Sequence, residues 1–185
     1  MEHKREKLVD ALQDCPVIAA LKSDAGLEKA VRSDCTTVFF LYGTILDIAS
    51  HVERVKQAGK IVFVHADLIE GLTARDITAD FIAQNTQADG IISTRPNIIR
   101  RAKALGLLTI QRFFLFDSLS FENVLRQSSN ADAVDLLPGT MPRLKPQIRQ
   151  PIIASGLLSD KQDVVAALSA GAQAVSTTKP ELWEI

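Results

Sequence analysis

Eight short apolar runs, helical patterns between them and polar clusters directly after several of them predict an α/β fold, a compact (β/α)8 TIM-like barrel. The runs are rich in Val, Ile and Phe, as buried parallel strands are. They are Val17–Leu21, Thr37–Leu41, Ile61–Val64, Gly90–Ile92, Leu107–Ile110, Ala133–Leu137, Pro151–Ala154 and Ala174–Val175. An open doubly wound sheet is the alternative, because the pattern alone does not prove that the sheet closes. The 185 residues are fewer than the roughly 250 of an ordinary barrel, so the loops must be short.

Helical patterns occupy the intervals after the second and third runs. The first has an apolar stripe and ends at Gly59. That stripe consists of Leu46, Ile48, Ala49, Val52 and Val55. In the next interval, Thr73 followed by Asp76 resembles a helix N-cap. The face that this helix should bury consists of Ile77, Phe81 and Ile82.

Two further helices follow the fourth and fifth runs. Pro96 is expected to begin one of them and Gly106 to end it. Its apolar residues are Ile98, Ile99, Ala102 and Leu105. Ser120 is the expected N-cap of the other helix. Its apolar residues are Phe121, Val124 and Leu125.

Helical structure is shorter toward the end of the chain. The segments after Met141 and at Pro180–Ile185 have room only for abbreviated turns. Between them, Ser159 and Gln162 have the spacing of a capping box, and Gly171 marks the end of that helix. Its buried residues are expected to be Val164, Val165 and Leu168.

Composition favours one globular domain covering residues 1–185, since 46% of the residues are hydrophobic and no linker interrupts the pattern. The formal net charge of −1 gives no overall basic field for nucleic acid. Met1–Asp10 lacks the apolar core of a secretory signal, and no run is long enough to span a membrane. Cys15 and Cys35 lack metal-ligand spacing. We expect a cytoplasmic protein with reduced thiols, a disulfide being the less favoured alternative.

Polar residues follow several runs, and parallel strands bring such residues to the same end of a barrel. Those after the third and fourth runs are His65, Asp67, Ser93 and Thr94. Asp67 is predicted to accept hydrogen bonds from a ligand, or else to cap a turn. His65 is either a ligand donor or a core histidine. Ser93 and Thr94 bind a ligand or, as their main role, cap the helix at Pro96.

Charged residues complete this predicted mouth. Arg112 ends the fifth run among apolar neighbours, and a buried arginine without a partner is costly. We therefore expect it to reach Asp135 on the sixth run or a ligand phosphate. Lys22 follows the first run, where it can meet an anion. The commoner explanation for such a lysine is an unpaired surface side chain.

The last two runs carry the sharpest chemical signal. Ser155–Gly156 and Ser176–Thr177 follow the seventh and eighth strands, where barrels often bind phosphate. Glycine lets the backbone approach an anion, and hydroxyls donate to its oxygens. Lys179 can add charge or point to solvent. For either segment alone, a turn and helix caps are the simpler explanation; two at the expected strands favour a phosphate site.

Five segments in order resemble the glycerol uptake operon antiterminator regulatory family. They are His65–Gly71, Gly90–Asn97, Ile110–Ser118, Leu137–Gly139 and Ala174–Thr178. The resemblance runs from about Pro16 to Trp183. It implies a TIM-like barrel that binds the effector glycerol 3-phosphate, has no other cofactor and is not an enzyme. It also implies transcription antitermination by binding the leader mRNA of glycerol-utilisation genes. A homo-oligomer is compatible with it.

Three residues depart from the family pattern. Asp135 stands where a glutamate is expected, Ser155 where a glycine is expected, and Lys179 where an asparagine is expected. These changes bear on the fine geometry of the site.

RNA binding is implied by the resemblance, and the residues permit it. The candidate basic residues form two groups, Arg95, Arg100, Arg101 and Lys103, and then Arg143 and Lys145. Most such clusters are solvated faces, and neither has interleaved aromatic residues.

The rival hypothesis is a small phosphate-binding barrel enzyme of the aldolase or isomerase type. Lys22, His65, Asp67 and Glu70 would then supply acid, base or nucleophile, with Lys22 at a Schiff-base position. No metal site with paired carboxylates and histidines is evident in the sequence.

Overall fold

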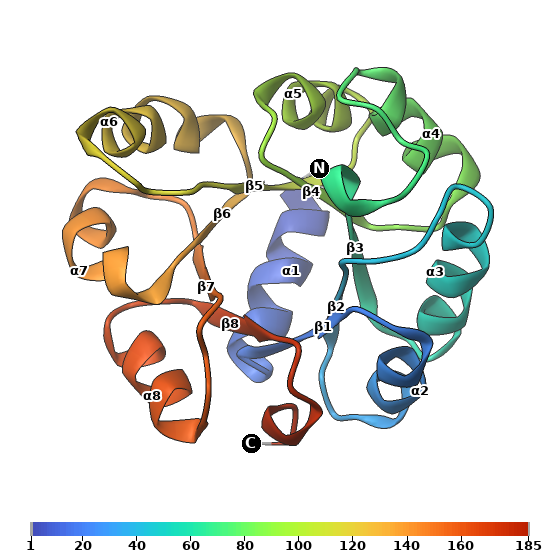
Figure 1. Cartoon of the computed structure of the whole chain (residues 1–185), viewed down its shortest axis with the longest axis horizontal. Coiled ribbons are helices and arrows are strands. Elements are labelled where there is room, and N and C mark those ends of the chain that lie inside the picture. Colours follow the sequence, from blue (N-terminus) through green and yellow to red (C-terminus); the bar gives the residue numbers. More distant parts are fainter. Residues whose placement is uncertain (1, 185) are drawn as a thin grey trace.

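The computed structural model describes residues 2–184, which form a closed barrel of parallel strands ringed by helices (Figure 1). The strands in this range are β1 (Val17–Leu21), β2 (Thr37–Phe40), β3 (Ile61–His65), β4 (Gly90–Ser93), β5 (Leu108–Arg112), β6 (Ala133–Leu136), β7 (Ile152–Ser155) and β8 (Ala174–Thr177). β8 pairs with β1, with Val17 opposite Val175. The closure confirms the predicted (β/α)8 barrel and excludes an open sheet.

Helices alternate with these strands. They are α1 (Glu2–Asp14), α2 (Asp24–Arg32), α3 (Ile48–Gln57), α4 (Ile77–Asn85), α5 (Pro96–Ala104), α6 (Ser118–Gln127), α7 (Met141–Leu144) and α8 (Lys161–Ser169). Short 3₁₀ turns lie at Ala66–Leu68, Ser128–Asn130, Pro138–Thr140, Lys145–Gln147 and Pro180–Leu182. The single turn of α7 and the final 3₁₀ turn confirm the abbreviated structure expected near the end of the chain.

The N-terminal helix α1 was not predicted, and it fills one end of the barrel. Leu8 and Leu12 of α1 are buried and belong to the same apolar cluster as Phe39 and Phe63, which face the barrel interior. Figure 1, viewed down the barrel, shows α1 crossing the centre of the ring. The role of α1 is not evident from its mostly charged and polar sequence. Only two leucines, one helical turn apart, pack into the end of the barrel.

Close packing inside the barrel explains why a glycine stands at position 90, in one of the segments that resemble the antiterminator family. A Cβ on Gly90 would lie 2.3 Å from the ring of Phe63, so only glycine fits beside that ring. Phe63 in turn meets Phe39 edge-on, with ring centroids 5.6 Å apart. The interior is therefore a packed core, and room for a ligand remains at the carboxyl ends of the strands.

The ends of two helices differ from the predictions. Asp76 is the N-cap of α4, whereas Thr73 contacts the Thr78 hydroxyl through its backbone. Asp117 caps α6 by accepting from the Ser120 amide at 2.8 Å. Ser120, predicted as the cap, is the third residue of that capping box.

The α8 cap was also misplaced by one residue. Asp160 caps this helix by accepting from the Asp163 amide, and Ser159 precedes the cap. Several apolar residues predicted to be buried are exposed. They are Leu46 (90% exposed), Ile77 (65%) and Val165 (53%). Leu46 lies before the first turn of α3, where the helical period does not yet hold.

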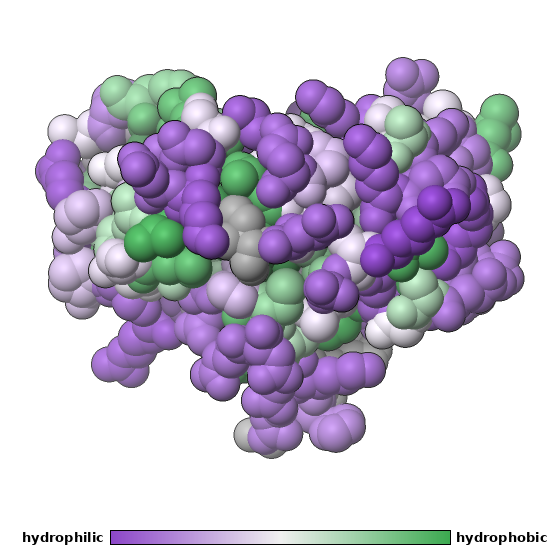
Figure 2. All heavy atoms as spheres, turned by 90° about the horizontal axis from the view of Figure 1, so that it is seen from below, coloured by the Kyte–Doolittle hydropathy of each residue, from purple (hydrophilic) through white to green (hydrophobic). Residues whose placement is uncertain are grey.

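The surface seen in Figure 2 is mostly hydrophilic, with apolar side chains in small separate patches. None of the helices within residues 2–184 combines the length and apolar composition needed to cross a bilayer. Cys15 and Cys35 carry free thiols.

Candidate functional site

The carboxyl ends of β5, β7 and β8 surround a cavity of about 130 Å³. Its lining includes Arg112, Ser155, Gly156, Ser176 and Thr177. The two segments predicted to bind phosphate and the arginine predicted at the mouth therefore meet in one place. Hydroxyl, amide and guanidinium donors around one small space suit a small anion.

Two serine hydroxyls form the floor of this cavity. Ser155 and Ser176 are register partners on β7 and β8, and their Oγ atoms lie 2.6 Å apart. Since one hydroxyl donates to the other, the second keeps a hydrogen to donate to a ligand. Lys179 crosses above β8 and donates from Nζ to the carbonyl of Ser159 at 2.8 Å, which ties together the loops after β7 and β8.

The β7–α8 loop has an unusual backbone. Gly156 has φ +89°, and a Cβ there would lie 3.1 Å from the Leu137 side chain. Leu157 follows with φ +58°, a conformation that L-residues avoid, and its side chain is 88% exposed. Strained backbone next to a polar cavity is typical of loops shaped for binding.

Arg112 and Asp135 form the predicted pair across β5 and β6. Nη1 of Arg112 lies 3.6 Å from Oδ2 of Asp135, whose side chain is only 2% exposed. Burial raises the pKa of Asp135 to about 6, although Arg112 and the nearby Ser155 hydroxyl oppose the shift. Its Oδ1 atom has no hydrogen-bond partner among the described residues. Asp135 does not itself line the cavity, and its predicted contact with a ligand stays a prediction.

His65 ends β3 and is buried beneath the mouth. Burial lowers its pKa to about 4, more than the nearby Asp67 carboxylate raises it. The imidazole is therefore neutral near pH 7. Its Nδ1 atom lacks a hydrogen-bond partner among residues 2–184. His65 does not line the cavity, and a ligand contact by it stays a prediction.

Asp67 and the β4–α5 loop form a closed hydrogen-bond network. Asp67 accepts from Ser93 Oγ at 2.7 Å, from the Thr94 amide at 2.7 Å and from Thr94 Oγ1 at 2.8 Å. Ser93 Oγ also accepts from the Arg95 amide at 3.0 Å. These contacts correspond to the turn-capping alternative for Asp67. Ser93 and Thr94 were wrongly predicted to cap the helix at Pro96, because the N-cap residue of α5 is Arg95, which has no side-chain capping hydrogen bond. A ligand contact by Asp67, Ser93 or Thr94 stays a prediction.

Lys22 and Glu70 are exposed and do not line the cavity. Glu70 contributes its backbone to a short pairing with Thr44. The structure therefore does not bring these two together with the residues of the cavity.

The basic residues predicted to contact RNA are partly engaged elsewhere. Arg95 Nε lies 3.9 Å from Asp67, Arg101 pairs with Asp80, and Lys103 donates to the Asn130 carbonyl. Arg100 and Lys145 are exposed on α5 and beside α7. Arg143 lies over the ring of Phe121, 5.0 Å from its centroid.

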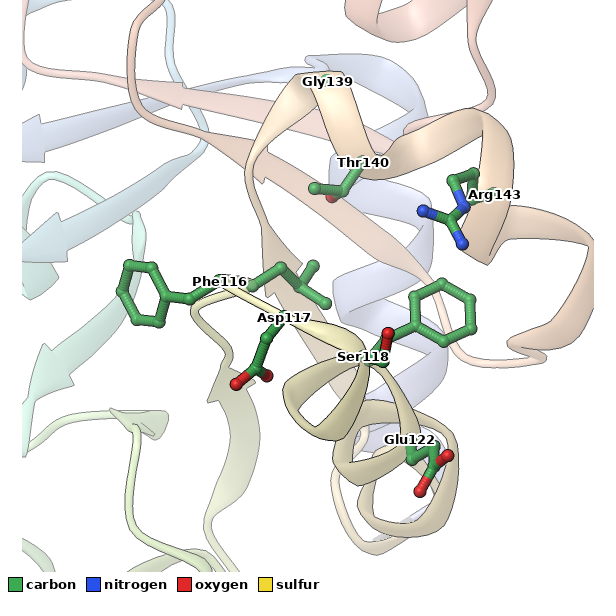
Figure 3. A pocket seen from close by; sticks show the side chains of 9 residues that line it. Phe116, Asp117, Ser118, Glu122, Gly139, Thr140 and Arg143 are labelled. Atoms are coloured by element: carbon green, nitrogen blue, oxygen red, sulfur yellow. The ribbon is translucent and has the colours of Figure 1, made fainter.

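A second, larger cavity of about 500 Å³ lies between the loops after β5 and β6 (Figure 3). Phe116, Asp117, Glu122, Thr140 and Arg143 are among its lining residues. It was not predicted, because it depends on two loop conformations. The concentration of phenylalanines after β5, at Phe113, Phe114 and Phe116, was the available signal.

The fold and the site define the class of protein as a closed parallel barrel with a small cavity, lined by hydrogen-bond donors, at the carboxyl ends of its strands. Among the described residues, no group of three or more His, Cys, Asp or Glu side chains is placed to hold a metal ion. The chain belongs to the glycerol-3-phosphate responsive antiterminator family, whose model matches residues 17–183. This confirms the resemblance found in the sequence.

Relatives and solved structures agree with this family. The uncharacterised protein YgcP of Escherichia coli K12 is 41% identical over 184 residues, which covers 96% of each chain. The glycerol uptake operon antiterminator regulatory protein of Listeria monocytogenes is 32% identical, with TM-score 0.85 over 90% of this chain and 94% of its own. A glycerol uptake operon antiterminator-related protein of Thermotoga maritima is 30% identical, with TM-score 0.82 over 92% of this chain and 99% of its own.

Proposed function

We propose that this protein is a glycerol-3-phosphate-responsive transcription antiterminator that binds the leader mRNA of glycerol-utilisation genes. Family membership supports the regulatory role and the effector. The observation that carries the proposal is the convergence of Arg112, Ser155, Gly156 and Ser176 on one cavity at the barrel mouth. RNA binding is the part of the proposal that most needs a direct test.

The cavity offers donors for the phosphate end of glycerol 3-phosphate, and two buried groups near the mouth, Asp135 and His65, are candidates for its glycerol end. Phosphate oxygens would accept from Arg112, from a serine hydroxyl and from the backbone of the Gly156 turn. The glycerol hydroxyls would donate to Oδ1 of Asp135, which lacks a partner among the described residues. A contact to His65 Nδ1 would complete the site.

Ligand binding can control RNA binding only if the effector prefers the RNA-competent state. We expect glycerol 3-phosphate to order the strained loop after β7 and to hold Arg112. Because phosphate contacts contribute to RNA affinity, binding should weaken as salt rises.

A gel-shift titration of leader RNA with and without glycerol 3-phosphate tests this function. Tighter RNA binding in the presence of the effector is expected, with inorganic phosphate as a control ligand. An RNA affinity that glycerol 3-phosphate leaves unchanged would contradict the proposal.

The enzyme alternative predicts turnover of a phosphorylated substrate. Distant barrels such as an N-acetylmannosamine-6-phosphate 2-epimerase from Clostridium perfringens share the fold at 12% identity. That likeness concerns the fold alone, and Lys22 is exposed away from the cavity. We expect no turnover of glycerol 3-phosphate or triose phosphates; a reaction lost in Lys22→Ala would favour the enzyme.

A further inference from the structure

The end of β5 and the loop after it carry three flat groups that lie one beside the next. The Arg112 guanidinium lies 5.4 Å from the centroid of the Phe114 ring. The Phe114 and Phe116 rings follow at 6.1 Å, with an angle of 20° between their planes. Phe116, the outer layer, is 85% exposed. We call these three side chains the Arg–Phe–Phe stack; an exposed aromatic ring at its end is free to receive another flat group.

We propose that the Arg–Phe–Phe stack is a platform on which the RNA stacks an unpaired base, with the base on the exposed ring of Phe116. This inference rests on the proposed function and identifies the contact surface for the RNA. Single-stranded RNA is commonly held by bases stacked on aromatic rings and guanidinium planes. Layered flat groups fit a base better than they fit an aliphatic protein side chain.

The charge distribution favours a contact that does not depend on positive charge alone. The formal net charge is −1, so no strong overall field attracts a polyanion. On the α5 side, Arg101 is neutralised by Asp80, and Arg95 lies near Asp67. Stacking supplies affinity that does not depend on free positive charge.

The surroundings of Phe116 leave its ring accessible. Figure 3 shows Phe116 projecting to one side of the loop, while Arg143 and Glu122 lie on the other side. A base on the Phe116 ring therefore avoids Glu122. Asp117, which is adjacent in sequence, is occupied in capping α6.

Arg112 connects this platform to the effector cavity. Its guanidinium lines the cavity, pairs with Asp135 and supports the Phe114 ring. A phosphate in the cavity would compete with Asp135 for the guanidinium, and any shift of that group changes the layer beneath Phe114. The effector thus sets the geometry of the platform. Reciprocity requires that RNA tighten effector binding by the same factor.

The test begins with an RNA selected from a random-sequence pool on the wild-type protein in the presence of glycerol 3-phosphate. Its dissociation constant is then measured for Phe116→Ala, Phe116→Leu and Phe116→Trp. We expect the alanine and leucine variants to bind the RNA at least about tenfold more weakly than wild type, and the tryptophan variant to bind it nearly as tightly as wild type. Leu46→Ala, which truncates another highly exposed apolar residue, is the matched control and should bind normally.

A second measurement locates the contact directly. Selected RNA that contains 5-iodouridine should crosslink to Phe116 on irradiation, and mass spectrometry of the peptide identifies the residue. Melting temperatures of the variants establish that each is folded.

The outcomes separate the two proposals. If no RNA is selected with glycerol 3-phosphate present, both the proposed function and the platform fail. If RNA is selected but Phe116→Ala binds it within about twofold of wild type, only the platform is wrong. Binding retained by Phe116→Leu overturns stacking in favour of a simple apolar contact.

Discussion

The two carboxylates at the barrel mouth, Asp67 and Asp135, differ in how completely they are hydrogen-bonded. On the side of β3 and β4, Asp67 accepts three hydrogen bonds from Ser93 and Thr94, which fixes the loop before α5. On the side of β5 to β8, Asp135 keeps an oxygen without a partner among the described residues. There too, Leu157 has a strained backbone.

This difference indicates a division of roles across one face. Buried polar groups are normally paired, so unpaired ones call for an explanation such as a ligand. The Asp67 network supplies a rigid frame on the β3–β4 side. On the β5–β8 side, Arg112 and the serine hydroxyls can donate to a small anion, whereas Oδ1 of Asp135 is an unpaired acceptor. Substitution of Asp67 should therefore change mainly stability, whereas substitution of Arg112 should change effector binding.

The largest effect is expected for Asp67→Ala. It removes three hydrogen bonds to a carboxylate and leaves the buried Ser93 hydroxyl without its acceptor. We expect a loss of about 3 kcal/mol in the free energy of unfolding, measured by urea denaturation. The exposed neighbour Glu70→Ala should change it by less than about 0.5 kcal/mol. Equal effects of the two variants would show that the network is not structural.

The raised pKa of Asp135 predicts an unusual pH dependence. The folded state holds this proton more tightly than the unfolded state, whose pKa is near 3.8. Burial of the charged form therefore destabilises the fold above about pH 6, and this penalty is relieved as the pH falls through 6 toward 3.8. Wild type should gain about 2 kcal/mol relative to Asp135→Asn between pH 7 and pH 4.5.

Denaturant titrations of both proteins at the two pH values provide the measurement. The other titrating groups, including His65, are common to the two proteins and largely cancel. An unchanged difference between wild type and Asp135→Asn would mean that Asp135 titrates normally.

Removing the Arg112 side chain tests anion binding on the β5–β8 side of the mouth. Arg112→Gln should weaken glycerol 3-phosphate binding by about 2 kcal/mol, because a charge-assisted contact to the phosphate is lost. It also leaves Asp135 without its cation. In the double variant with Asp135→Asn, stability should recover but effector affinity should not. Isothermal titration calorimetry and denaturation separate the two effects, and recovery of affinity would place the phosphate elsewhere.

The smallest effect is expected at the glycine turn after β7. Gly156→Ala forces a side chain into a backbone with φ +89° and within 3.1 Å of Leu137. We expect a loss of about 1 kcal/mol in stability. Gly139→Ala is the matched control, because a Cβ there meets nothing within 4 Å. Similar melting temperatures for the two variants would mean that the turn adapts freely.

The strands could be predicted because each is a buried parallel strand and so appears as an apolar run. The Arg112–Asp135 pair was equally predictable, since a buried arginine needs an acidic partner. Helix caps were harder: Asp117 and Ser120 are both good caps, and only the backbone decides between them. The α1 helix was missed because Leu8 and Leu12 are too few to give a clear apolar stripe.

The Arg–Phe–Phe stack lay beyond prediction for a different reason. Phe114 and Phe116 are two residues apart, which in a strand would merely place them on one face. Their parallel rings depend on the path of the loop, and that path is set by the capping box of α6.

The seal that α1 forms at one end of the barrel has a kinetic consequence. Because the barrel interior is packed, a metabolite at the mouth would leave toward the carboxyl ends of the strands, where the loop that carries Phe116 also lies. An RNA lying there would trap the metabolite until it dissociates. The dissociation rate of the RNA, rather than that of the effector, would then determine how long the effector stays bound.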